Sequence, residues 1–346
     1  MSSRRKLYLD IGVGERRGVV TLDDLPERLL IERDADVGRL QPGAVLAARI
    51  SRVEKGLGIA FLEAPEGQSL VVARAGLPDG SGEGRFVAAQ VLAPARRGKS
   101  ASAKILSHDA GPVRWIGDAP DFRRRLQAFA PEAQVIDGAE AREAADEAVS
   151  AIAQIEFPLR GGGRLTIEQT RALVAVDVDV GTAAGQDARF SATKINQLAI
   201  HEAARLARLK GLGGLMVIDL AGKGHNGPVL IEAAKAAFAP DQPGVALGAI
   251  SRFGVLEVAI PWRTEPLIER LADPDGRMSV ATEALSLIRA IEREAGPGRR
   301  VRAVCSPDVA EAAGALAPRL IDRIGARFEI LAEPERSRAG WTAQSL

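Results

Sequence analysis

Short apolar stretches that alternate with glycine-bearing turns fill the first third of the chain. Their alternation of apolar and polar residues predicts strands in residues 1–42 and four or five closely spaced antiparallel strands in residues 43–107. Closely spaced strands with glycine turns between them are typical of a small barrel. The sequence therefore predicts an N-terminal group of strands followed by a β-barrel.

Helical spacing of apolar residues replaces this pattern further along the chain. It predicts helices over residues 139–155 and 188–210, and Gly211 is placed to end the second. Apolar strands, predicted over 165–181 and 213–222, flank the second helix. A strand, helix and strand of these lengths are typical of a crossover unit whose two strands are parallel.

The last part of the chain predicts a small α/β domain over residues 277–346. Its pattern runs helix, strand, helix, strand, with one helix expected over 308–325. At 346 residues the chain is too long for one typical domain. The fold class predicted from the pattern is therefore α/β in several domains, of the α+β multidomain kind.

Composition narrows the classes of protein that the chain represents. Its 46 Lys and Arg against 45 Asp and Glu give a net charge of +1, which alone indicates no partner. The predicted barrel is nevertheless basic, with nine Lys and Arg against five acids in residues 43–107. No apolar run is long enough to cross a membrane, and the first residues lack the pattern of a secretory signal. We therefore expect a cytoplasmic protein with no membrane partner.

The single cysteine, Cys305, excludes an internal disulfide and a zinc-thiolate cluster. It lies in a predicted strand, where a small core residue is a better interpretation than a nucleophile.

The acidic residues at two predicted strand ends are the main chemical signal. In "RALVAVDVDVG" Asp177 and Asp179 are two residues apart, so both point to one face of the strand, and Asp219 ends the next strand. If the two strands are parallel neighbours, all three carboxylates converge at their carboxyl ends. Unpaired acids in such proximity repel unless a cation neutralises them, and oxygen ligands favour Mg²⁺ or Mn²⁺. Each Asp taken alone is better explained as a helix cap or turn former, but three in this arrangement are harder to explain as three caps.

Weaker candidates lie in the barrel and in a loop. Phe61 could stack on a base and Lys99 could hold a phosphate, as in barrels that bind single strands. A core phenylalanine and a solvated lysine explain these two residues equally well. A solvated helix face is the better interpretation of His201, and a loop position that of His225.

These segments, once assembled, resemble the catalytic half of the ribonuclease E/G family. The resemblance extends from residue 43 to about residue 330 in the family's order. It is carried by "ARISRVEKGLGIAFLEA", "GGGRLTIEQTRALVAVDVDVG", "NQLAIHEAARLARLKGLGGLMVIDLAG", "ISRFGVLEVA" and "ATEALSLIRAIEREAG".

The resemblance implies a magnesium-dependent endoribonuclease with several subdomains. They would be the N-terminal strands of a ribonuclease-H-like subdomain (1–42), an inserted OB-type barrel that binds RNA (43–107), the rest of the ribonuclease-H-like subdomain (108–163), a deoxyribonuclease-I-like catalytic subdomain (164–270) and a small C-terminal α/β domain (277–346). The family's two metal-binding aspartates fall on Asp177 and Asp219, and its barrel aromatic and basic positions on Phe61 and Lys99. Asp179 stands where the family usually has an asparagine that assists by hydrogen bonding.

Several departures from the family pattern imply a reduced member. The segment that holds the family's pocket for an RNA 5′-monophosphate is shortened here, and its Arg-Thr pair is absent between 108 and 160. Arg252 matches an RNA-binding arginine of that pocket but lacks the pocket's other residues. The paired cysteines that join two subunits through zinc are replaced around "ADPDGR", so no zinc is expected, while a homodimer through the C-terminal domain stays open. The acid usual after the second metal ligand is also missing from "DLAGKG".

Two functions follow as hypotheses. One is a metal-dependent endoribonuclease that cleaves single-stranded RNA in RNA processing, including rRNA processing, or in decay, with water attacking the phosphodiester at an ion held by Asp177 and Asp219. The other is a non-catalytic RNA-binding remnant of the same family. The presence of both aspartates favours the enzyme.

Overall fold

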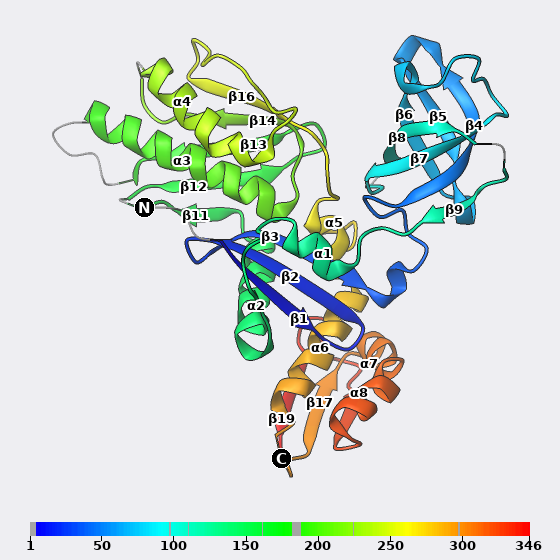
Figure 1. The fold of residues 1–346 in the computed structure, drawn as a ribbon. Coiled ribbons are helices and arrows are strands. Elements are labelled where there is room, and N and C mark those ends of the chain that lie inside the picture. The colour runs from blue at the N-terminus through cyan, green and yellow to red at the C-terminus, as the bar shows by residue number, and fades with distance from the viewer. Residues whose placement is uncertain are drawn as a thin grey trace.

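The fold is known from a computed structural model that describes residues 5–96, 98–109, 111–160, 162–181, 188–223, 225–296 and 298–346, with the side chains of 188–191 left out. Within these residues the chain forms three open sheets and one closed barrel, joined by helices (Figure 1). The mixed α/β class predicted from the sequence is confirmed. Among the helices of the described residues, none combines the length and the hydrophobicity that crossing a bilayer requires.

The N-terminal sheet has four strands and two buried faces. Its order is β10-β1-β2-β3, with β1 (Arg5–Ile11), β2 (Glu15–Leu22) and β3 (Leu25–Arg33) antiparallel and β10 (Val135–Ile136) parallel to β1. One face packs Leu7, Leu9 and Val20 against α1 (Phe122–Gln127). The other face belongs to the main core, which also contains α2 (Gly138–Ala153). The strict alternation of strand side chains explains why both faces can be buried.

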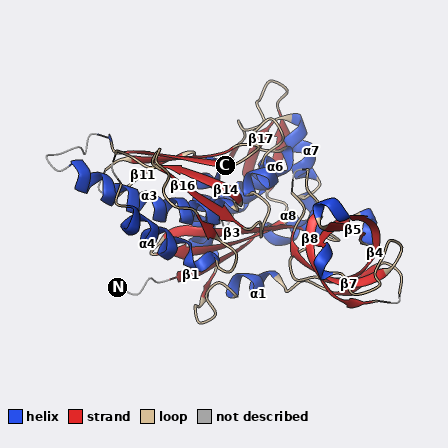
Figure 2. Ribbon diagram, turned by 90° about the horizontal axis from the view of Figure 1, so that it is seen from above, coloured by secondary structure: helices blue, strands red, loops and turns tan. Residues whose placement is uncertain are grey.

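The barrel closes through five strands. They are β4 (Val45–Glu54), β5 (Ile59–Glu63), β6 (Ser69–Ala73), β7 (Phe86–Ala93) and β8 (Ala101–His108). Their order is β5-β6-β8-β7-β4, β4 also pairs with β5 to close the ring, and β6 runs parallel to β8. A further strand, β9 (Arg114–Gly117), adds to β4. Figure 2 shows the ring nearly end-on, and the predicted small barrel is confirmed.

The central sheet has six strands in the order β11-β12-β13-β14-β16-β15. β13 and β14 are parallel, and the other four pairings are antiparallel. The bounds are β11 (Glu156–Pro158), β12 (Arg164–Gln169), β13 (Val174–Asp179), β14 (Gly214–Asp219), β15 (Ala246–Leu247) and β16 (Val255–Ile260). The predicted crossover unit with two parallel strands is confirmed.

The single strand expected over residues 165–181 is wrong, because the chain turns back between β12 and β13. Thr170 forms this turn: its backbone N–H donates to Leu173 O (2.9 Å), and its hydroxyl oxygen accepts from the N–H of Leu173 (3.1 Å). Threonine side chains offer the backbone such local bonds in place of a continued ladder. The apolar run therefore makes two antiparallel strands instead of one long strand.

Two helices cover one face of the central sheet. These are α3 (Ala188–Lys210) and α4 (Gly227–Phe238), which lie side by side beneath the strands (Figure 2). The sheet residues that face them include Val174, Val176, Val178, Met216, Ile218, Leu256 and Val258, all buried in the main core. On the opposite face the alternate residues of the same strands are exposed or half-buried. The sheet therefore has one buried face and one open face.

The C-terminal domain is a three-stranded sheet with helices. Its order is β18-β17-β19, with β17 (Val301–Cys305) parallel to β18 (Phe328–Ala332) and antiparallel to β19 (Thr342–Ser345). The helices are α5 (Leu267–Leu271), which leads into the domain, α6 (Val280–Glu294), α7 (Pro307–Gly314) and α8 (Ala317–Ile324). Cys305 is buried in the core of this domain, as its strand position predicted.

The prediction of one helix over residues 308–325 is also wrong, because the structure has two helices there, α7 and α8. Pro318 lies in the first turn of α8. Proline has no N–H to donate to the preceding turn and its ring crowds the carbonyl there, so a helix ends before it and a new one starts.

A buried ion network ties the N-terminal sheet to the central domain. The carboxylate of Glu27 on β3 is fully buried and meets Arg5 of β1 (2.7 Å) and Arg208 of α3 (3.0 Å). Arg208 also contacts Asp241, which follows α4 (2.6 Å). Buried charges persist only when they are paired, so this network fixes how α3 lies on β3.

Candidate active site

Asp177 and Asp219 lie directly opposite each other at the carboxyl ends of β13 and β14. They are register partners in the parallel pair, so both side chains leave the sheet on the same face. Neighbouring strands are about 5 Å apart, so the two carboxylates are close neighbours. Both residues are exposed on the open face of the central sheet, between buried neighbours that anchor the strands. The structure thus brings together the two aspartates that the sequence proposed as metal ligands.

Asp179 lies on the same face of β13, one strand alternation beyond Asp177, and takes different partners. Its carboxylate accepts a hydrogen bond from the backbone N–H of Gly181 (2.9 Å) and lies 3.7 Å from the guanidinium of Arg164. Arg164 is its register partner on β12. The expected convergence of three carboxylates is therefore not what the structure shows: Asp179 is turned toward Arg164 and the strand end.

The carboxylate pair is suited to a hard divalent cation that takes only one or two of its ligands from the protein. Within the described residues no group of three or more His, Cys, Asp and Glu side chains is arranged to hold a metal. A cage made wholly of protein side chains is therefore excluded for those residues. Mg²⁺ is usually bound through one or two carboxylates, with water and substrate phosphate completing its shell. The carboxylates of Asp177 and Asp219 form no hydrogen bond or ion pair within the described part of the chain, so their oxygens are free to ligate such an ion.

The segment after Asp219 is held in place by a buried asparagine. Asn196 of α3 is fully buried; its amide donates to Ala221 O (3.0 Å) and accepts from the N–H of Ala221 (2.9 Å). This two-way bond satisfies the backbone just beyond the strand end and fixes where the loop leaves β14. Asn196 was not among the site residues predicted from the sequence. The one available signal was a polar residue on the apolar side of a helix.

A second loop borders the carboxylate pair. The N–H of Leu220 donates to Gly254 O (3.1 Å), which ties the turn before β16 to the end of β14. Arg252 lies in that turn, with its guanidinium over the ring of Phe253 at 4.7 Å, and Phe253 is 75% exposed. The imidazole of His225 lies against Gly254, where an added Cβ would come within 2.7 Å of Nε2. The turn that carries Arg252 is thus bonded to the end of β14, and it also carries an exposed aromatic ring, Phe253, that was not predicted from the sequence.

The barrel residues lie on another part of the molecule. Phe61 of β5 is half-buried on the outside of the barrel, with the guanidinium of Arg52 over its ring at 4.8 Å. Lys99 is exposed in the loop between β7 and β8 and bonds through its backbone to Arg96. Arg96 in turn lies over the ring of Trp262, just after β16, at 4.4 Å. The loop that carries Lys99 therefore contacts the segment that follows β16 of the central sheet.

Part of the chain is similar in sequence to a known protein family. Residues 118–260 match the profile of the Ribonuclease E/G family. This segment contains the carboxylate pair, Asp179 and Arg252, whereas the barrel residues lie outside it.

Curated relatives also match part of the chain. Ribonuclease E of Escherichia coli strain K12 is 32% identical over 146 residues, which is 40% of this chain and 13% of the relative. A chloroplastic Ribonuclease E/G-like protein of Arabidopsis thaliana is 32% identical over 118 residues, or 33% and 12%. Ribonuclease E of Buchnera aphidicola from Acyrthosiphon pisum is 28% identical over 163 residues, or 45% and 17%. The chain thus spans 12 to 17% of the length of these relatives.

Proposed function

The chain belongs to the ribonuclease E/G family, and from this premise we propose that it is an endoribonuclease that cleaves single-stranded RNA at a Mg²⁺ or Mn²⁺ ion held by Asp177 and Asp219. The observation that carries the proposal is the placement of these two carboxylates, opposite each other on parallel strands and open to solvent. Two like charges at this separation repel, so a divalent cation between them lowers the energy of the folded site.

The residues around the pair have distinct roles in this proposal. When bound, the ion supplies positive charge that polarises the phosphate and lowers the pKa of a water. Asp177 and Asp219 hold it at the open face, where a polynucleotide can approach without displacing any element. Asp179 keeps lone pairs beyond those used by Gly181 and Arg164, so it can accept a hydrogen bond from the attacking water. Arg252 supplies positive charge to the approaching phosphates.

In this proposal the barrel binds the RNA strand. Its closed ring of five strands supports an OB-type fold, in which the second and third strands and the loops beside them bind single strands. Phe61 lies on the second strand of the barrel, and Lys99 lies in the loop between the fourth and fifth. Stacking of a base on Phe61 and attraction of a phosphate to Lys99 would hold RNA without dependence on its sequence. We also propose that residues 1–42 and 108–163 form a ribonuclease-H-like subdomain and that residues 164–270 form a deoxyribonuclease-I-like subdomain.

The test compares cleavage and binding in matched variants. Asp177→Asn and Asp219→Asn should each lower the cleavage rate of a labelled single-stranded RNA by roughly 100-fold or more, the scale of losing a preorganised electrostatic contact. Binding of the same RNA in chelator should persist. Glu257→Gln is the control, because Glu257 is exposed on the same open face of the sheet, on the neighbouring strand β16. Wild-type cleavage by the Asp177→Asn/Asp219→Asn double variant would refute the site.

The same assay separates the enzyme from the RNA-binding remnant. Fragments that appear with Mg²⁺ or Mn²⁺ and not with chelator support the enzyme. Salt-sensitive RNA binding without fragments in either condition would leave only the binding function.

A further inference from the structure

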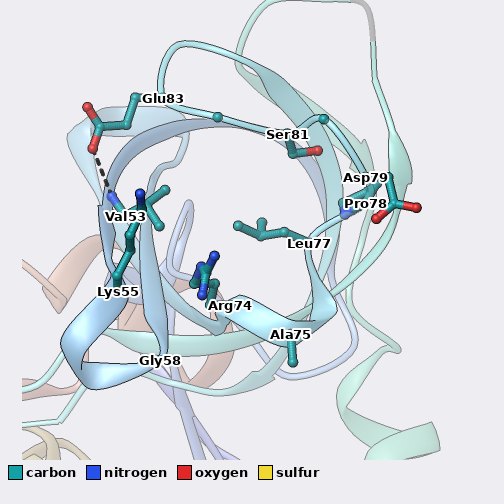
Figure 3. Close-up of a pocket in the computed structure, with 12 residues that line it drawn as sticks. Val53, Lys55, Gly58, Arg74, Ala75, Leu77, Pro78, Asp79, Ser81 and Glu83 are labelled. Atoms are coloured by element: carbon teal, nitrogen blue, oxygen red, sulfur yellow. Dashed lines mark hydrogen bonds between the residues drawn. The ribbon is translucent and has the colours of Figure 1, made fainter.

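A cavity lies at one end of the barrel, and Phe61 is not among the residues that line it. Its volume is about 800 Å³, within the range of small-ligand sites. The end of β4, the turn before β5 and the loop of residues 74–83 that follows β6 line it (Figure 3). The cavity therefore belongs to the barrel alone and shares no residue with the carboxylate pair.

The cavity lining carries two cations and two carboxylates, and the two cations lie on the same side of the space (Figure 3). Lys55 and Arg74 are exposed and form no ion pair with any other described residue. Of the two acids in the lining, Glu83 accepts a hydrogen bond from the N–H of Val53 (3.0 Å), and the carboxylate of Asp79 is directed away from the space that Lys55 and Arg74 border (Figure 3). Two unpaired cations on one side of a concave surface focus positive potential there.

The remaining walls suit something larger than a phosphate. Leu77 is directed into the space, and Val53 and Pro78 contribute further apolar surface (Figure 3). The hydroxyl oxygen of Ser81 is enclosed without a hydrogen-bond partner within the described residues. Leaving a buried hydroxyl unsatisfied is unfavourable, so a ligand group that bonds with this oxygen would remove that cost. Apolar wall, hydroxyl and two cations match the parts of a nucleotide.

From these features we propose that the barrel-end cavity binds a nucleoside phosphate. The phosphate lies between Lys55 and Arg74, the base packs against Leu77, and a ribose hydroxyl bonds with Ser81. The nucleotide is either one unit of an RNA strand or a free mononucleotide. The first source rests on the RNA-binding function proposed above, and the second is independent of it.

The experiment titrates the full chain with uridine or adenosine monophosphate in chelator, by calorimetry. Lys55→Ala and Arg74→Ala should each weaken binding roughly tenfold or more, as expected for loss of a hydrogen bond to a charged group. Lys104→Ala removes an exposed cation of β8 outside the cavity and should leave the affinity unchanged. Ser81→Ala should weaken binding without lowering the urea midpoint, because the hydroxyl has no partner to lose.

A parallel titration with a ten-nucleotide single-stranded RNA distinguishes the two sources. If the ligand is a strand unit, the cavity variants weaken RNA binding beyond Lys104→Ala and the mononucleotide competes with RNA. If it is a free nucleotide, RNA affinity follows the Lys104→Ala control. The proposal is overturned when neither ligand separates the cavity variants from that control, or when inorganic phosphate competes as well as the mononucleotide. Failure of the nuclease proposal appears elsewhere, in RNA cleavage by the wild-type chain.

Discussion

Replacing Glu27 by glutamine should destabilise the protein strongly. Its carboxylate is fully buried and contacts the guanidinium groups of Arg5 and Arg208. Removal of one partner from a buried ion pair costs about 3–5 kcal/mol, because the other charge stays buried without compensation. The amide keeps one acceptor oxygen, and Arg208 keeps Asp241, so we expect the lower end, about 3 kcal/mol. For an unfolding slope of about 3 kcal/mol per M urea, this lowers the midpoint by about 1 M.

The same carboxyl gives this prediction a pH signature. Burial acts to raise the pKa of Glu27, but the hydrogen bond from Arg5 and the charges of Arg208 and Arg5 outweigh it, so the pKa lies below its ordinary value of 4.5. The unfolded chain then binds more protons near that pH, so stability is present above about pH 4.5 and is lost as the pH falls through the folded pKa. As the pH falls through this range, the free energy of unfolding should decrease less for Glu27→Gln than for the wild type.

Urea unfolding followed by circular dichroism between pH 7 and pH 3 measures both effects. Glu232→Gln is the matched control, because Glu232 pairs with Lys235 at 2.6 Å on an exposed helix surface. Such a pair contributes at most about 1 kcal/mol. Equal midpoints for Glu27→Gln and Glu232→Gln at pH 7 would refute the view that the buried network holds α3 on β3.

Two further predictions concern the barrel and the end of α3. Phe61→Ala should weaken single-stranded RNA binding by about 1–3 kcal/mol with the salt dependence unchanged. Lys99→Ala should instead lower the slope of log affinity against log salt by about 1. Fluorescence anisotropy at several salt concentrations measures both effects, and equal slopes in the two variants would contradict this prediction. Gly211→Ala should cost about 2 kcal/mol or more in urea unfolding, since Gly211 has φ +69° and a Cβ there would lie 2.6 Å from Glu265 O. Gly138→Ala has the same backbone strain (φ +78°) with open space around the new Cβ, so it should cost about half as much, and equal losses would show that the clash is relieved.

The sequence predicted those features that depend on neighbouring residues. The alternation of β13 and the apolar run of β14 identify two strands, and a helix ending at Gly211 between them makes parallel pairing the expected arrangement. The pairing of Asp177 with Asp219 follows from that arrangement, because Asp219 ends β14 and Asp177 lies two residues before the end of β13. The barrel followed in the same way from closely spaced strands and turns.

The features that the sequence did not predict depend on residues far apart in the chain. Asn196 bonds to Ala221, and Glu27 meets Arg208, through contacts that exist only after the elements have packed. The turn at Thr170 was missed although four consecutive polar residues, 168–171, interrupt the apolar pattern there. The partner of Asp179 was missed with the turn: Arg164 comes opposite it only because the chain reverses there.

The one-sided burial of the central sheet separates two kinds of evolutionary constraint. On β13 the valines at 174, 176 and 178 maintain the hydrophobic core, while Asp177 and Asp179 project from the other side into solvent. A sequence change at the aspartates can therefore alter chemistry with little penalty to folding, and a change at the valines does the reverse. The scaffold of this sheet therefore does not depend on the chemistry proposed for its open face.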